Sequence, residues 1–329
     1  MKTKKIAILG AGSWGTAVAV HLANCGNQVM LWGHSPQHVK EMIAQRCNQR
    51  YLGDVIFPQS LIPVVELNQC LEQATEIIIA VPSHAFAKLL YQIHKPECGL
   101  AWLTKGIDPI RNKLLSELVA ERWGQSFPIA IISGPSFARE VAHFLPTALT
   151  LASNNPDYQK SIQSLLHCNN IRAYLSNDVI GVQLCGAVKN VLAIACGISD
   201  GLGYGANAKA ALITRGLAEM RRLGIQMGAR EDTFMGLAGV GDLVLTCTDD
   251  QSRNRRFGLC LGRGISSLEA EKQIGQVVEG KHNAAQVCAL AEQFQVEVPI
   301  CSQVNDVLKD KITPQQATIN LMSRSPREE

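Results

Sequence analysis

The first half of the chain alternates short apolar runs with longer stretches of helical periodicity. The runs are almost continuously apolar rather than alternating with polar residues, which is typical of strands buried on both faces of a sheet. The predicted strands are Ile6–Leu9, Gln28–Trp32, Ile77–Val81, Leu100–Thr104 and Ile129–Ser133, with Ala148–Leu151 and Ile171–Tyr174 as further candidates. Their spacing suits strand–helix–strand units, so we predict a doubly wound parallel sheet with helices on both faces.

After about residue 180 the pattern changes. Apolar residues recur at helical spacing from Ile180 to Ile198 and again from Ile213 to Leu223, and few β-branched runs follow. This half is therefore predicted to be helical. The length of 329 residues corresponds to about two domains. We predict an α/β domain over residues 1–178 and an all-helical domain over residues 179–329.

Composition and charge exclude several classes of protein. A hydrophobic fraction of 47% excludes a disordered chain, and a net charge of +3 gives no electrostatic case for a nucleic-acid partner. No apolar run approaches the ~20 residues of a membrane span, and glycines interrupt the apolar N-terminal stretch, unlike a secretory signal. The eleven cysteines form no CxxC pair, and His34 and His38 lack the glutamate of HExxH. We expect a cytoplasmic protein with reduced thiols, no metal site and no membrane insertion.

A glycine-rich turn follows the first predicted strand. Gly10, Gly12 and Gly15 match G-x-G-x-x-G and lead into a helix-compatible stretch, Thr16–Asn24. In this context the first glycine permits a tight turn, the second lets the backbone approach a pyrophosphate, and the third permits close packing of helix on strand. The N–H groups of the helix N-terminus would then face the phosphates. The pattern predicts a dinucleotide site, the alternative being a glycine-rich turn without a ligand.

The end of the second predicted strand bears on which dinucleotide binds. An acidic residue there would bind the ribose 2′-hydroxyl of NAD, but the chain has Trp32-Gly33-His34. NAD selectivity is therefore not encoded, and NADP is favoured. His34 is placed to lie near a 2′-phosphate, with Lys40, Arg46 or Arg50 assisting. The alternative is that His34 is a solvated turn residue.

Two lysines are candidates for contact with a negatively charged ligand or for acid–base chemistry. Lys105 follows the predicted strand Leu100–Thr104, and ligands bind at the C-terminal ends of strands in open α/β sheets. The alternative is a surface lysine at a strand end. Lys189 lies at the edge of the apolar stripe of the first helix in the second half. Burial there would lower the pKa of Lys189 toward the range useful in acid–base catalysis, whereas a snorkelling lysine would keep its charge in water.

Three polar turns complete the candidate chemistry. Gly134 and Ser136 follow the predicted strand Ile129–Ser133, where Ser136 either caps the next helix or faces an anion. Asp242 lies in a glycine-rich turn and either caps a helix or orients a lysine ammonium or a substrate hydroxyl. Ser252–Gly258 contains three arginines whose forked donors fit phosphate, the alternative being a solvated basic loop.

The order of these motifs resembles that of the bacterial NAD(P)-dependent glycerol-3-phosphate dehydrogenases. The motifs are Gly10–Gly15, Thr104–Gly106, Gly134–Glu140, Gly186–Asn190, Gly239–Asp242, Ser252–Gly258 and Val277–Gly280. Each is weak alone, but the set is specific and extends from about Lys5 to Ile312. The resemblance implies a Rossmann domain followed by a helical domain of the 6-phosphogluconate-dehydrogenase C-terminal type. It also implies a homodimer that interconverts dihydroxyacetone phosphate and sn-glycerol 3-phosphate, usually for phospholipid synthesis.

By motif position the resemblance implies roles for individual residues. Lys189 would be the catalytic acid–base, with Lys105 and Asp242 as further catalytic residues. The implied substrate contacts are Lys105, Gly134, Ser136, Lys189, Asp242, Ser252, Arg253 and Asn254. The implied contacts to NADP or NAD are Gly10, Gly12, Ser13, Trp14, Gly15, His34, Lys105, Ala138, Arg253, Val277 and Glu279. The family often has arginine where this chain has His34, so the choice between NAD and NADP stays open.

Two other functions fit parts of the pattern. A β-hydroxyacid dehydrogenase of the same architecture would act on a carboxylate, which the arginines of Ser252–Gly258 fit as well as a phosphate. A non-catalytic dinucleotide sensor would keep the glycine turn but would not need Lys105, Lys189 and Asp242 together.

Overall fold

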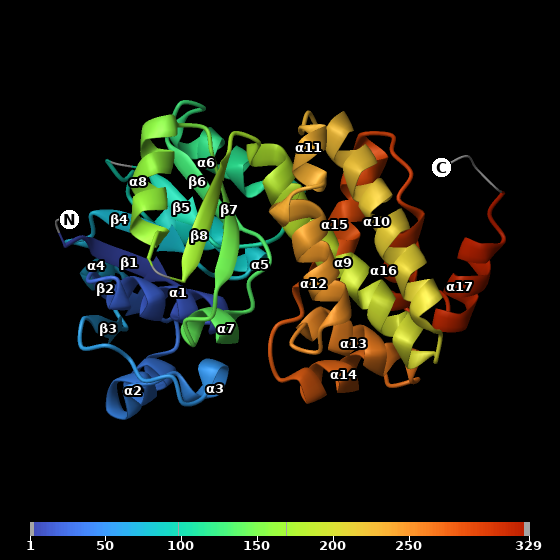
Figure 1. Cartoon of the computed structure of the whole chain (residues 1–329), viewed down its shortest axis with the longest axis horizontal. Helices are drawn as coiled ribbons and strands as arrows, with labels where there is room; N and C mark the ends of the chain where they lie inside the picture. The colour runs from blue at the N-terminus through green and yellow to red at the C-terminus, as the bar shows by residue number, and fades with distance from the viewer. Residues whose placement is uncertain (1–2, 98, 169, 326–329) are drawn as a thin grey trace. The chain divides into compact units, whose positions relative to one another are not determined.

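The computed structural model describes residues 3–97, 99–168 and 170–325, which form two compact units (Figure 1). Unit 1 contains the described residues up to Thr104 together with Leu115–Val179, and unit 2 contains Lys105–Leu114 together with those from Ile180 onward. A single division between residues 178 and 179 therefore misplaces Lys105–Leu114. This segment belongs to unit 2 because Ile107 and Leu114 pair with each other and are buried in the hydrophobic cluster of that unit.

Unit 1 is built on an eight-stranded sheet with the order β3-β2-β1-β4-β5-β6-β7-β8. The strands are β1 (Lys5–Leu9), β2 (Gln28–Trp32), β3 (Leu61–Val64), β4 (Glu76–Ile79), β5 (Leu100–Trp102), β6 (Ile129–Ser133), β7 (Thr147–Ser153) and β8 (Ile171–Ser176). Neighbouring strands are parallel except β6 and β7, which are antiparallel. The first six follow the strand order of a Rossmann fold, so the predicted fold is confirmed.

One strand, β3, escaped the sequence prediction. Its four residues include Pro63, which cannot donate a hydrogen bond to a neighbouring strand. Proline is tolerated here because β3 lies at the edge of the sheet and pairs only with β2. A short segment interrupted by proline carries no continuous apolar run, which is the signal used for the other strands.

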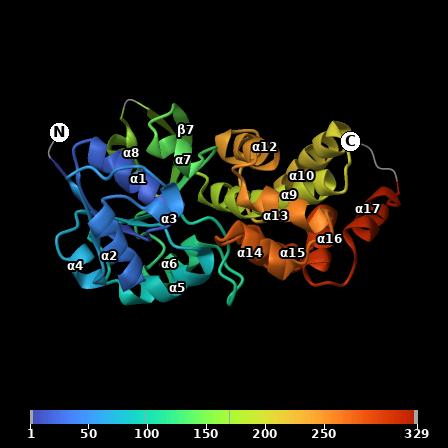
Figure 2. The same cartoon turned by 90° about the horizontal axis from the view of Figure 1, so that it is seen from below.

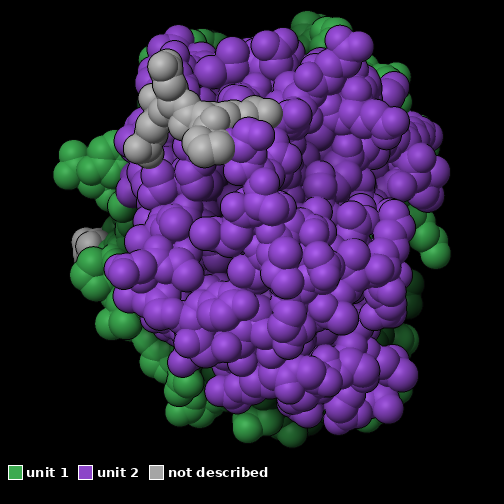
Figure 3. Space-filling model, turned by 90° about the vertical axis from the view of Figure 1, so that its right-hand side faces the viewer, with its two compact units in different colours: residues 1–104, 115–179 green, residues 105–114, 180–329 purple. Residues whose placement is uncertain are grey.

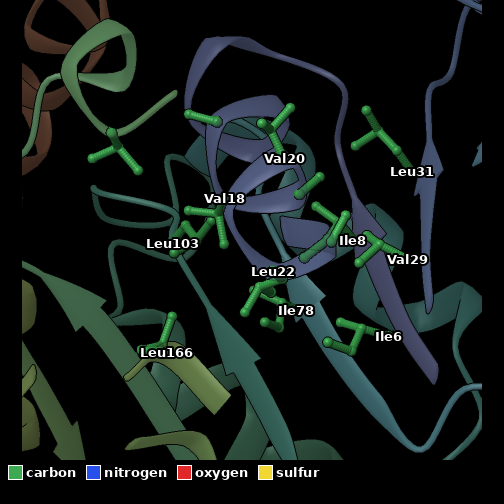
Figure 4. Packing of buried hydrophobic residues seen from close by; sticks show 14 of the residues in the cluster. Ile6, Ile8, Val18, Val20, Leu22, Val29, Leu31, Ile78, Leu103 and Leu166 are labelled. Carbon is green, nitrogen blue, oxygen red and sulfur yellow. The ribbon is translucent and has the colours of Figure 1, made fainter. Parts of the chain in front are cut away.

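Helices cover both faces of this sheet, as Figure 2 shows for α1 and α8 on one face and α5 and α6 on the other. The helices of unit 1 are α1 (Ser13–Asn24), α2 (Pro36–Gln45), α3 (Gln49–Leu52), α4 (Leu67–Leu71), α5 (Ser83–Gln92), α6 (Leu115–Trp123), α7 (Ala138–Ala142) and α8 (Pro156–Leu166). Figure 4 shows Leu22 of α1 next to Ile78 of β4, and Val18 of α1 next to Leu103, which follows β5. All four side chains are buried, and such burial contributes about 1.5–3 kcal/mol per large aliphatic side chain.

Unit 2 is helical, as predicted, and its residues form one continuous mass in Figure 3. Its helices are α9 (Val179–Gly201), α10 (Ala206–Gln226), α11 (Glu231–Phe234), the π-helical turn η1 (Leu237–Gly241), α12 (Asp242–Thr248), α13 (Arg253–Gly262), α14 (Ser267–Ile274), α15 (Glu279–Gln293), α16 (Pro299–Leu308) and α17 (Pro314–Met322). Among the described residues, only α9 is long and apolar enough to cross a membrane, and 89% of its most apolar window is buried inside the protein. It is the core helix of unit 2.

Glycines bring α13 unusually close to α9. A side chain on Gly197 of α9 would overlap the carbonyl oxygen of Arg255, and one on Gly258 of α13 would overlap that of Ile194. The two backbones therefore touch at these positions, because each glycine faces a backbone carbonyl group of the other helix. This contact fixes the start of α13 against the core helix.

Candidate functional site

The glycine-rich turn of unit 1 connects β1 to α1, and its three glycines differ in what they contact. Gly10 has φ +132°, and a Cβ there would lie 2.6 Å from the carbonyl group of Ala80. A Cβ on Gly15 would overlap the carbonyl oxygen of Gly10. Gly12 is different, because a Cβ on this residue would meet nothing within 4 Å. The fold itself requires Gly10 and Gly15, whereas the space at Gly12 is open to a ligand.

The N-terminus of α1 suits a phosphate group. Gly12 is its N-cap residue and supplies no side-chain hydrogen bond to the first turn. A helix N-terminus without a side-chain cap attracts anions through its N–H groups and its dipole. Ser13 and Trp14 begin the helix and are half-buried. The open space at Gly12 and this helix end together fit a pyrophosphate, so the turn is suited to a dinucleotide.

His34 lies just past the end of β2 and is exposed. Of the three basic residues predicted to assist His34, Arg46 is engaged elsewhere. Its guanidinium donates to the carbonyl oxygens of Phe57, Pro58 and Leu61 at 2.6–3.1 Å. Arg46 therefore holds the loop before β3, and the prediction that it assists His34 is corrected.

The turn after β6 carries Gly134 and Ser136, at the same edge of the sheet as Gly10 because β1, β4, β5 and β6 are parallel. The Ser136 hydroxyl donates to the Gly134 carbonyl oxygen at 2.9 Å. The N-cap residue of α7 is Phe137, so the alternative in which Ser136 caps this helix is wrong. Ala138 is the first residue of α7.

Three charged residues of unit 2, Lys105, Lys189 and Asp242, form one buried group, here called the lysine–aspartate cluster. Asp242 is the first residue of α12 and is 1% exposed. Its Oδ1 accepts from Lys189 Nζ of α9 at 2.5 Å, and its Oδ2 accepts from Lys105 Nζ at 2.8 Å. Asp242 is not a helix cap, because Gly241 holds that position. One carboxylate thus holds two ammonium groups side by side.

Burial dominates the electrostatics of this cluster. It lowers the pKa of Lys189 from 10.5 to about 8, against the attraction of Asp242 and with the repulsion of Lys105. Burial alone would raise the pKa of Asp242, but the two lysines outweigh it and hold that pKa below its usual value. At neutral pH the cluster has one carboxylate for two lysines, one of which exchanges its proton near physiological pH.

Thr246 is a member of the site that the sequence analysis missed. Its hydroxyl donates to the backbone carbonyl oxygen of Asp242 at 2.6 Å and accepts from Lys189 Nζ at 3.0 Å. The signal was available, since Thr246 follows Asp242 by four residues and such pairs lie on one face of a helix. Two protons of the Lys189 ammonium are therefore held, one by Asp242 and one by Thr246.

Beside Lys189, a chain of hydrogen bonds ties α9 to α13 and α15. The Asn254 amide nitrogen donates to the Asn190 side-chain oxygen at 2.9 Å, and the Asn254 side-chain oxygen accepts from the Gly280 N–H at 2.9 Å. Asn190 in turn donates to Glu279 at 3.3 Å. Asn254 is buried and uses both ends of its amide, so it positions the start of α13. The sequence offered no sign of the part played by Asn190.

The start of α13 presents the other residues predicted to bind an anion. Ser252 is its N-cap residue and accepts from the Arg255 N–H at 3.2 Å. Arg253 is half-buried and donates to the side chain of Gln276 at 3.4 Å, next to the exposed Val277. Among the described residues no group of three or more His, Cys, Asp or Glu side chains is placed to hold a metal ion.

Comparisons with known proteins identify the family. The family model for the NAD-dependent glycerol-3-phosphate dehydrogenase N-terminus matches residues 5–159, and that for the C-terminus matches residues 178–319. The chain is 68% identical to glycerol-3-phosphate dehydrogenase (NAD(P)+) of Legionella pneumophila strain Paris, over 100% of both chains. It is 50% identical to the enzyme of the same name from Bartonella tribocorum, again over 100% of both chains.

Solved structures give the same result. The crystal structure of glycerol-3-phosphate dehydrogenase from Coxiella burnetii has a TM-score of 0.94 at 51% identity, covering 98% of this chain and 99% of that one. D-Mandelate dehydrogenase shares the fold alone, with a TM-score of 0.65 at 16% identity. The predicted family is confirmed: the chain belongs to the NAD-dependent glycerol-3-phosphate dehydrogenases.

Proposed function

We propose that the protein interconverts dihydroxyacetone phosphate and sn-glycerol 3-phosphate, using NADPH or NADH as the hydride donor. The observation that carries this proposal is the lysine–aspartate cluster, which places an exchangeable proton and a second positive charge in one buried site. A ketone reduction needs such a site, because the carbonyl oxygen gains negative charge as hydride arrives at carbon. The names of the relatives supply the substrate.

The nicotinamide cofactor supplies the hydride when bound. In unit 1 the turn at Gly12, Ser13 and Trp14 would hold its pyrophosphate, with Gly10 and Gly15 shaping the turn. His34 would lie near the adenosine ribose, which leaves NADP favoured but not fixed. Ala138, Lys105, Arg253, Val277 and Glu279 are proposed as the remaining cofactor contacts.

Lys189 would move the proton. In the reduction, its ammonium gives a proton from Nζ to the carbonyl oxygen, so that the ketone becomes a secondary alcohol. Two of its three protons are held by Asp242 and Thr246, which leaves one for the substrate. In the reverse direction the neutral amine takes the hydroxyl proton. A pKa of about 8 suits both directions, because general acid–base catalysis is most efficient near the working pH.

The substrate phosphate would bind at the start of α13. Arg253 offers a forked guanidinium, and Ser252 stands at the N-terminus of a ten-residue helix, where anions are favoured. Asn254 was predicted to touch substrate directly; its engaged amide favours a positioning role instead. Gly134 and Ser136 of unit 1 complete the proposed substrate contacts.

The oligomeric state, the location and the metabolic role of the protein are also proposals. We infer a cytoplasmic homodimer without membrane insertion, which supplies glycerol 3-phosphate for phospholipid synthesis. Burial of the apolar helix α9 supports the absence of membrane insertion. Sedimentation equilibrium of the purified protein tests the dimer.

The activity itself is tested by following absorbance of the reduced nicotinamide after addition of dihydroxyacetone phosphate. NADPH and NADH are run in parallel, and dihydroxyacetone without phosphate is the control. We expect rapid oxidation with the phosphorylated ketone and far lower turnover without the phosphate, because the phosphate grip positions the carbonyl. Cofactor binding without oxidation of either nucleotide would favour the sensor, and activity only on hydroxyacids would favour the β-hydroxyacid dehydrogenase.

A further inference from the structure

Unit 2 contains a cavity of about 520 Å³ that the proposed reaction does not use. Helices α9, α10, α16 and α17 line it, and no member of the lysine–aspartate cluster does. The walls are mainly apolar, with Ile198, Leu212, Val304 and Leu321 contributed by the four helices in turn. Its volume lies within the ~300–1,000 Å³ typical of small-molecule sites.

A buried hydroxyl in this cavity lacks a partner. Ser199 of α9 is 4% exposed and lines the cavity, and its Oγ has no hydrogen-bond partner among the described residues. Ser199 shares one face of the helix with Ala195 and Ile198, which line the cavity as well. Because buried polar groups are rarely left unbonded, the hydroxyl indicates a polar atom of a ligand or of water at this point.

The uncompensated charge lining the cavity is positive. Three arginines line it, of which Arg222 donates to a backbone carbonyl and Arg324 pairs with Glu297. Arg215 of α10 is exposed, and in the described part of the chain it has no ion pair or hydrogen bond. Among the residues that the structure describes, the one acidic residue in the lining is Glu219.

Glu219 does not neutralise Arg215. Its two carboxylate oxygens accept from the backbone N–H groups of Ile300 and Cys301, at 2.7 and 3.2 Å. Burial raises the pKa of Glu219 to about 7, so its charge is partly lost at neutral pH. An apolar cavity is thus combined with a free guanidinium and an unpartnered hydroxyl.

We propose that this cavity binds an amphiphilic anion, namely a single alkyl chain that ends in a carboxylate or a phosphate monoester. The chain lies against the apolar walls, the head pairs with Arg215, and Ser199 donates to an oxygen of the ligand. A neutral head leaves Arg215 without a partner, and a cationic head is repelled. The site is independent of the proposed reaction, since none of the proposed catalytic residues lines it.

The test is isothermal titration calorimetry of the full-length protein below the micelle concentration of each probe. The probes are dodecanoate and dodecyl phosphate, with dodecyl glucoside and dodecyltrimethylammonium as the neutral and cationic controls. We expect saturable binding of one or both anions with a stoichiometry of one per chain. The affinity for the neutral control should be lower by at least about tenfold, as expected for loss of a charge-assisted hydrogen bond.

Two pairs of variants locate the site. Arg215→Gln should weaken anion binding about tenfold, whereas Arg221→Gln removes a charge from the same helix outside the cavity and should have no effect. Ala211→Trp should block the cavity, and Thr214→Trp is its matched control. Both positions are exposed, so the tryptophan does not disturb the core.

Each outcome of these titrations either supports the proposal or overturns it. Saturable anion binding that is weakened by Arg215→Gln and Ala211→Trp, but by neither control, supports the proposal. Binding of dodecanoate alone or of dodecyl phosphate alone identifies the head group. Absence of saturable binding, equal affinity for the cationic probe, or affinities unchanged in both cavity variants would overturn the proposal.

Discussion

Replacing Asp242 by asparagine tests the energetics of the lysine–aspartate cluster. The amide has nearly the same shape as the carboxylate but no charge, so two ammonium groups held at 2.5 and 2.8 Å lose their counter-ion. The site is well buried, with the Lys189 and Lys105 side chains 8% and 13% exposed. Breaking a buried ion pair on one side costs about 3–5 kcal/mol, and we expect unit 2 to lose stability of that order.

The loss of stability in Asp242→Asn should depend on pH. Removing the negative charge lowers the pKa of Lys189 further below its value of about 8, while its pKa in the unfolded chain is unchanged. At a pH below the folded-state pKa of Lys189 in both the parent and Asp242→Asn, Lys189 is charged in each protein. The difference between their free energies of unfolding, here called the stability gap, is then largest. As pH rises toward 8, Lys189 loses its proton first in the variant, which relieves the repulsion. The gap therefore narrows with rising pH up to about 8 and is constant above it.

Urea unfolding followed by far-UV circular dichroism at several pH values measures this gap. Asp306→Asn is the matched control, since it breaks a partly exposed ion pair with Lys311 and should cost less than about 1 kcal/mol. The four tryptophans all lie in unit 1, so their fluorescence gives a separate signal for that unit. The reasoning is refuted if Asp242→Asn is no less stable than Asp306→Asn, or if the gap does not change with pH.

Three further predictions concern a turn, a helix contact and a buried carboxylate. Gly12→Ala should weaken binding of NADPH, measured by fluorescence titration, without lowering the melting temperature, whereas Gly15→Ala should destabilise unit 1 because its Cβ has no space. Gly258→Ala should cost unit 2 about 1–3 kcal/mol or more in urea unfolding by forcing α13 away from α9, while Gly205→Ala, which has open space, should cost far less. Glu219 has a folded-state pKa raised from 4.5 to about 7, so it lowers stability as pH rises through that window, by about 3 kcal/mol in total. Glu219→Gln should remove this slope, and an unchanged slope would show that another group causes it.

Much of the fold was predictable because the apolar pattern reports burial directly. Seven of the eight strands and the helical character of unit 2 follow from the continuity or periodicity of apolar residues. The exceptions depend on tertiary context. β3 is short and contains Pro63, and Lys105–Leu114 belongs to unit 2, where Ile107 and Leu114 are buried in the core and Lys105 pairs with Asp242. No local pattern distinguishes such a segment from a loop of unit 1.

The candidate site, like the fold, could be predicted only in part from the sequence. Lys189 was singled out because a lysine beside an apolar stripe needs a partner, and its partner proved to be Asp242, 53 residues further along the chain. Thr246 and Asn190 were missed because their importance comes from which atoms they face, not from residue type. Arg46 shows the opposite error, since a basic residue near a predicted phosphate site instead bonds three carbonyl oxygens.

The central claim is that Lys189 transfers the proton when dihydroxyacetone phosphate is reduced. Lys189→Met keeps the length and apolar stem of the side chain but removes its proton, and NADPH oxidation at saturating substrate compares it with the parent protein. We predict that turnover falls by about 10²–10⁴-fold, the usual contribution of general acid–base catalysis, while NADPH affinity stays within a few-fold. Turnover within a few-fold of the parent would contradict the account.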